Sequence, residues 1–141
     1  MKCNVRKDVT SNGLLDCDID CITEGLCLLE KDINDFVARG DFSKISLENA
    51  QMNLNCIASV RKQLENPRQS LDLNELKVIY IGLNFLRDDL NLPAEKRSEP
   101  NRNLTSTQVM KIAADVRAAH QKITAVFTRM GVDIMASLRG F

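Results

Sequence analysis

Apolar residues recur along this chain at alternating spacings of three and four, the period of amphipathic α-helices. The first run covers residues 15–36 and stops at Gly40, a typical helix terminator. Its apolar stripe consists of Leu15, Ile19, Ile22, Leu26, Leu29, Ile33 and Phe36. A second run, over residues 47–64, follows the capping-type residue Ser46 and ends before Pro67. The pattern predicts two consecutive helices in the N-terminal half.

Two further helices are predicted, and each begins with a capping box. Asp72 and Glu75 open an unusually apolar run that lasts until the next proline. Thr105 and Gln108 open another run, whose period continues nearly to the C-terminus. Gly131 either lies inside this last helix, at a cost of about 1 kcal/mol, or ends it and leaves a short extra turn.

The connections complete the expected architecture. No useful length of chain alternates with period two, and residues 92–104 contain two prolines and several charges, which predicts one exposed loop. We therefore expect an all-α, antiparallel (up-and-down) four-helix bundle with a short extra C-terminal helix if the fourth helix ends at Gly131. The 141 residues suit one domain, 1–141, in which residues 1–13 are expected to be a flexible N-terminal segment.

The chain has zero net charge, from 19 basic and 19 acidic residues, which argues against nucleic acid or an anionic membrane as the partner. The charges are nevertheless segregated. Residues 8–48 hold ten acidic and three basic side chains, whereas residues 96–141 hold eight basic and three acidic ones. We interpret this as attraction between the first and last helices as neighbours. The alternative is that Lys111, Lys122 and Arg129 meet an acidic partner or a nucleic-acid backbone, although no aromatic residues interleave them.

Cysteine usage and the N-terminal residues suggest a compartment. The five cysteines are odd in number and lack the paired spacing of a small secreted scaffold: Cys3, Cys17, Cys21, Cys27 and Cys56. The N-terminal residues contain no apolar signal-peptide region, and no window reaches the roughly 18 apolar residues that span a bilayer. We expect a cytoplasmic protein with reduced thiols and no membrane partner.

Two candidate chemical groups remain. Cys17 and Cys21 are four residues apart on one helical face and could share a soft metal ion, but the other ligands of a structural zinc site have no diagnostic spacing. We interpret both as small packing residues. His120, the only histidine, falls on the apolar stripe of the last helix, where we expect it to be buried and hydrogen-bonded. No phosphate-binding loop or nucleophile elbow occurs.

These observations predict no catalytic, cofactor-binding or metal-binding residue, no cofactor and no enzymatic activity. Two alternatives stay open: a thiol-based metal-binding or redox bundle using Cys17 and Cys21, and a His120-dependent enzyme or phosphorelay component.

The helices have more apolar faces than a lone bundle requires. The first helix carries a second stripe that we expect to face water, and the third is apolar on two sides. Either the third helix is central in a flattened bundle, or these stripes bind a second copy or a partner helix. We interpret the protein as a non-enzymatic protein–protein interaction module (adaptor, inhibitor, regulator or small chaperone) and expect a homo-oligomer. The predicted partner-binding residues are Cys17, Cys21, Leu28, Val78, Ile81 and Phe85.

Overall fold

The computed structural model describes residues 14–40, 44–65 and 71–138. These residues form α1 (Asp16–Arg39), α2 (Lys44–Glu65), α3 (Leu73–Leu90), α4 (Ser106–Arg129) and the short α5 (Ile134–Ser137), with two 3-10 turns, η1 (Ala94–Lys96) and η2 (Glu99–Asn101). The all-α prediction of four main helices and a short C-terminal helix is confirmed. The predicted flexible segment 1–13 lies outside the described residues.

The expected start and stop signals act as predicted in three places. Gly40 ends α1 with a φ of 69°, a left-handed conformation that glycine adopts without strain. Asp72 and Glu75 each accept a hydrogen bond from the other's backbone N–H, at 2.8 and 2.9 Å, and so cap α3. The side chains of Thr105 and Gln108 cap α4 in the same way. Local sequence therefore sets these helix ends.

At two helix boundaries the structure adds to the sequence prediction: one differs from it, and the other decides between two predicted alternatives. α2 begins at Lys44, so Ser46 lies inside its first turn and is not the N-cap. α4 ends at Arg129, and Gly131 has a φ of 70°, so the continuous version of the last helix is ruled out.

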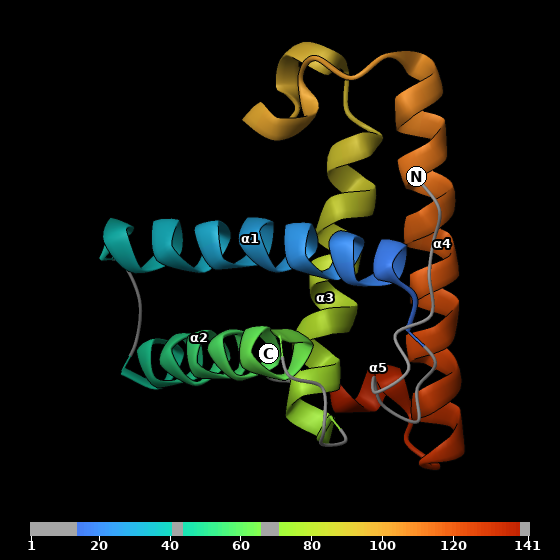
Figure 1. Ribbon diagram of the computed structural model, residues 1–141. Coiled ribbons are helices and arrows are strands. Elements are labelled where there is room, and N and C mark those ends of the chain that lie inside the picture. The colour runs from blue at the N-terminus through green and yellow to red at the C-terminus, as the bar shows by residue number, and fades with distance from the viewer. Residues whose placement is uncertain (1–13, 41–43, 66–70, 139–141) are drawn as a thin grey trace.

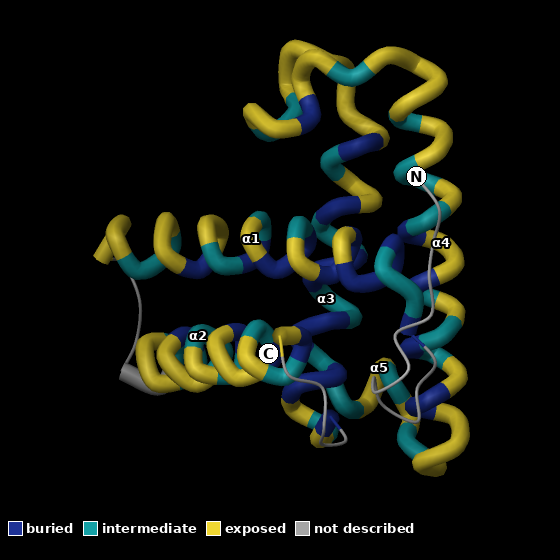
Figure 2. The backbone as a smooth tube through the Cα atoms, viewed as in Figure 1, coloured by how far each residue is buried: buried dark blue, intermediate teal, exposed yellow. Residues whose placement is uncertain are grey.

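The four main helices form two antiparallel pairs, and the α1–α2 pair runs across α3 (Figure 1). α3 packs against each of the other three main helices, as α1 does, and the contact between these two forms the centre of the fold. Gly25 of α1 and Gly82 of α3 bring the backbones of these two helices into direct contact. Buried residues are concentrated along the inner faces where the helices meet (Figure 2).

The core explains why several apolar positions do not reach the surface. Leu14, Cys17 and Cys21, on the second stripe of α1, are all buried. The expectation that this stripe faces water is wrong for these three residues, because the N-terminal half of α1 packs against α4 as well as α3. An ion pair between Asp18 and Lys122 marks that contact, so α1 and α4 are neighbours with attracting charges.

Within the described part of the chain, no helix combines the length and the hydropathy needed to cross a membrane.

Candidate functional site

The six predicted partner-binding residues fall into two groups of three. Cys17, Cys21 and Val78 are buried, Val78 because the other helices cover the central α3. These three side chains are in the core and present no surface to a partner. The other three are half-buried: Leu28, Ile81 and Phe85.

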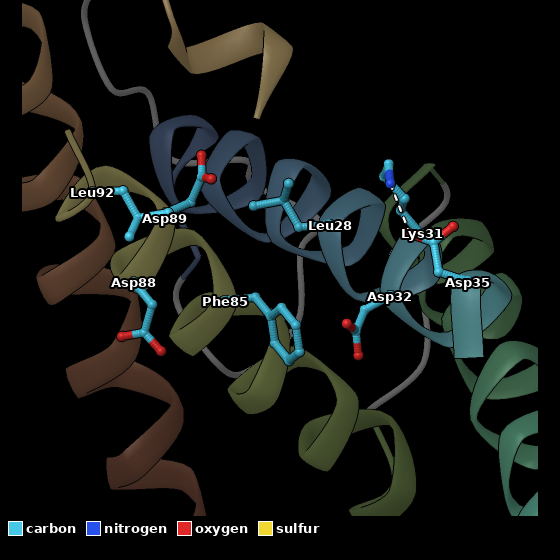
Figure 3. A pocket seen from close by; sticks show the side chains of 8 residues that line it. All are labelled: Leu28, Lys31, Asp32, Asp35, Phe85, Asp88, Asp89 and Leu92. Carbon is cyan, nitrogen blue, oxygen red and sulfur yellow. Dashed lines mark hydrogen bonds and ion pairs between the residues drawn. The ribbon is translucent and has the colours of Figure 1, made fainter. Parts of the chain in front are cut away.

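The half-buried residues line two hollows that meet at Phe85 and Asp32. The first hollow, of about 350 Å³, lies between α1 and the end of α3 and is lined by Leu28, Lys31, Asp32, Asp35, Phe85, Asp88, Asp89 and Leu92 (Figure 3). The second, of about 300 Å³, extends toward α2 and is lined by Leu29, Asp32, Ile33, Phe36, Arg39, Ser46, Asn49, Ala50, Asn53, Ile81 and Phe85. We call the two hollows together the α1/α3 groove.

The apolar side chains of the groove come from helix faces that, in the sequence, exceed what a lone bundle requires. Ile81 and Phe85 are four residues apart and so share one face of α3. Leu28 reaches the same groove from α1, and Leu92, 41% exposed, lies at its end beyond α3. Half-buried apolar side chains on rigid helices are typical of surfaces that bind another protein.

Four carboxylates border the first hollow, and the sequence prediction missed them as part of the site. In Figure 3 the Phe85 ring lies between the carboxyl groups of Asp88 and Asp32. Helical spacing could have found both, because Asp32 follows Leu28 by four residues and Asp88 follows Phe85 by three.

The four carboxylates that border the first hollow differ in whether a nearby positive charge neutralises them. Lys31 pairs with Asp35 at 2.8 Å, and both side chains are well exposed. Asp88 pairs with Arg87 at 3.2 Å, also in solvent. Among the described residues, Asp32 has no ion pair. With a single lysine in its lining, the first hollow keeps an excess of negative charge.

Asp89 fastens the loop of residues 92–104 to the end of α3. Its Oδ1 accepts a hydrogen bond from the Ser98 backbone N–H at 2.8 Å. Its Oδ2 accepts from the Ser98 hydroxyl at 2.8 Å and from the Asn101 amide at 2.7 Å. Asn101 is buried, so the loop predicted to be exposed has one internal anchor.

Glu24 of α1 joins this anchor from the other side. Burial raises the pKa of its carboxyl, a hydrogen bond from the Asn101 side chain lowers it, and the negative charge of Asp89 raises it further. α1, the end of α3 and the loop of residues 92–104 therefore meet at Asp89, beside the groove.

Cys17 and Cys21 are not bonded to each other, and Cys21 is a free thiol. Cys17 is disulfide-bonded, which corrects the expectation that all the thiols are reduced. Burial, with Asp115 and other nearby carboxylates, raises the pKa of the Cys21 thiol to about 12. A thiol with such a pKa stays protonated at neutral pH and is a poor nucleophile and metal ligand. In residues 14–40, 44–65 and 71–138, no three or more His, Cys, Asp and Glu side chains cluster around a possible metal position.

His120 has a packing role at the contact of α3 and α4. Its Nε2 lies 3.1 Å from Asn84 Oδ1, and its ring centroid lies 4.6 Å from that of Tyr80. Burial lowers the pKa of the imidazole, and the charge of Arg87 lowers it further. The prediction of a hydrogen-bonded histidine on the apolar stripe is confirmed, although the ring is half-buried rather than fully enclosed.

Comparison of the chain with protein-family models, with curated proteins and with solved structures returns no match. Its function is therefore argued from the groove itself.

Proposed function

We propose that this protein is a non-enzymatic protein–protein interaction module, acting as an adaptor, inhibitor, regulator or small chaperone, and that the α1/α3 groove is its binding surface. The supporting observation is that the apolar side chains of Leu28, Ile81 and Phe85 are left half-buried along one continuous groove. The helices around them already have a complete core.

The length of the groove suits an amphipathic helix as its occupant. Ile81 and Asp88 are seven residues apart on α3, which is about 10 Å at 1.5 Å per residue. Residues i and i+7 of an occupying helix are separated by the same distance, which is the anchor spacing of helix-in-groove recognition. The groove walls come from α1, α2 and α3, so the folded helices form the surface before binding.

Site-specific photo-crosslinking in the cells of origin tests this function. A photoreactive phenylalanine analogue replaces Phe85 in one variant and Met110, an exposed residue of α4, in the control variant. We expect discrete protein adducts at position 85 that are missing at position 110. No adduct at position 85, or the same adducts at both positions, would overturn the proposal.

Self-association is tested on the purified protein. Native mass spectrometry at several concentrations gives the oligomeric state of wild type and of Phe85→Asp, with circular dichroism as the check on folding. We expect a wild-type oligomer that persists in a still helical Phe85→Asp, with its self-contact on another surface. An oligomer that Phe85→Asp dissociates would place a second copy in the groove.

A further inference from the structure

We propose that the occupant of the α1/α3 groove is a basic amphipathic helix of another protein. Its apolar ridge would lie on Phe85 and Leu28, and its Lys or Arg side chains would face Asp32 and Asp88. This inference rests on the function proposed above and deepens it by naming the chemistry of the partner.

Charge complementarity selects a basic partner. The first hollow is lined by four carboxylates and one lysine; that lysine pairs with Asp35, and Arg87 pairs with Asp88 in solvent, which leaves two carboxylates of the lining outside any ion pair among the described residues. The hollow also lies beside the last turn of α3, where the helix dipole adds partial negative charge. An acidic segment or an anionic surface would be repelled from it.

The position of the charges orients the occupant. Asp32 and Asp88 lie on opposite sides of Phe85, on different helices (Figure 3). An apolar anchor against the Phe85 ring would therefore have cationic residues on both sides of it. The second hollow contains Arg39 at its far end and no carboxylate other than Asp32, so the basic residues belong at the end nearer Leu92.

A second copy of this chain is a poorer match. Its most basic helix is α4, but two of the lysines there are used within the molecule. Lys111 pairs with Asp115 at 2.8 Å, and Lys122 pairs with the buried Asp18. To face Asp32 and Asp88 of another molecule, both lysines would have to leave these intramolecular pairs.

The test uses a defined probe, a synthetic 14-residue helical peptide with Leu at positions 3, 7 and 10 and Lys and Ala elsewhere. In the matched peptide, Glu replaces every Lys. Fluorescence anisotropy measures binding to wild type, to Asp32→Asn/Asp88→Asn and to Phe85→Ala. The control protein is Glu48→Gln/Glu65→Gln, which removes the same charge from exposed positions on α2 outside the groove.

We expect wild type to bind the Lys peptide at least tenfold more tightly than the Glu peptide. Both groove variants should weaken binding of the Lys peptide at least fivefold, and the control protein should stay within twofold of wild type. Equal weakening by the groove and control charge variants would show unspecific attraction and overturn the inference, as would equal binding of the two peptides.

The outcomes also distinguish a failure of this inference from a failure of the proposed function. Adducts at position 85 together with no preference for the Lys peptide would retain a protein-binding groove and reject a basic helix as its occupant. An oligomer that Phe85→Asp dissociates, with no Lys-peptide binding, would identify a second copy as the occupant and again reject the basic helix. Absence of adducts, oligomer and peptide binding would overturn both proposals.

Discussion

Gly25 of α1 and Gly82 of α3 lie back to back where the two helices cross, and a Cβ built on Gly25 would be 2.4 Å from the carbonyl oxygen of Gly82. The backbones approach this closely because neither residue has a side chain. The crossing also places the C-terminal half of α1 beside that of α3, so this glycine contact determines the spacing of the groove walls.

Replacing Gly25 with Ala should destabilise the fold by about 3 kcal/mol, because the new methyl group meets backbone that cannot rotate away. Gly82→Ala should destabilise it less, since its nearest contact would be at 3.0 Å. Denaturant unfolding measures both, with the exposed Thr23→Ala of α1 as the control. A Gly25→Ala protein as stable as wild type would show that the helices can separate without penalty.

The ion pair between Lys122 and Asp18 should be far more important for stability than its neighbour on α4. Asp18 is fully buried, so Lys122→Met leaves an unpaired carboxylate in the core and should lower the free energy of unfolding by about 3 kcal/mol. Lys111→Met removes an exposed pair and should change it by less than about 0.5 kcal/mol. Similar losses in the two variants would contradict the burial of Asp18.

Helix boundaries were predictable because they depend on local chemistry. Gly40 and the capping boxes of α3 and α4 act through residues at most a few positions away. Gly131 left two outcomes open, because a glycine inside a helix costs only about 1 kcal/mol relative to alanine.

The site was predictable only in part. Leu28, Ile81 and Phe85 belonged to surplus apolar faces, but the same pattern also selected Cys21 and Val78, which the structure buries. Periodicity assigns a residue to a face of its helix and does not say which neighbouring helix covers that face. Asn101 shows the limit most clearly, since its burial depends on a carboxylate twelve residues away.

The single histidine allows a direct test of its environment. We expect the NMR titration of His120 to give a pKa below its ordinary value of 6.5, chiefly because of burial. Arg87→Gln should raise this pKa without fully restoring it, because burial remains the larger cause. An unchanged titration in Arg87→Gln would show that the guanidinium does not act on the ring.

The same histidine predicts how stability depends on pH. Below pH 6.5 the unfolded chain binds a proton at this residue that the folded protein does not, so the free energy of unfolding should fall as the pH falls through this range. The fall should end once the pH is below the folded pKa. His120→Gln should remove this component, measured by denaturant unfolding at pH 7.5 and at steps below 6.5.

The adjacent carboxylates Asp88 and Asp89 should differ sharply in their effect on the loop of residues 92–104. Asp89→Ala removes three hydrogen bonds from Ser98 and Asn101 and should make opening of the loop about 2 kcal/mol easier. Tryptic cleavage after Arg97 or Arg102 should then accelerate roughly 10- to 30-fold. Asp88→Ala, which removes an exposed pair only, should leave the cleavage rate near that of wild type.

The central position of α3 has a consequence for how the molecule opens. α2 packs on α1 and α3, whereas α3, like α1, packs on all three other main helices. Amide protons of α3 should therefore exchange with solvent only when the whole protein unfolds, while those of α2 can exchange through a smaller opening that leaves the α1, α3 and α4 contacts in place. A helix bound in the groove would contact α2 and α3 together. Its binding should therefore slow deuterium uptake in α2, whose amide protons otherwise exchange through the smaller opening.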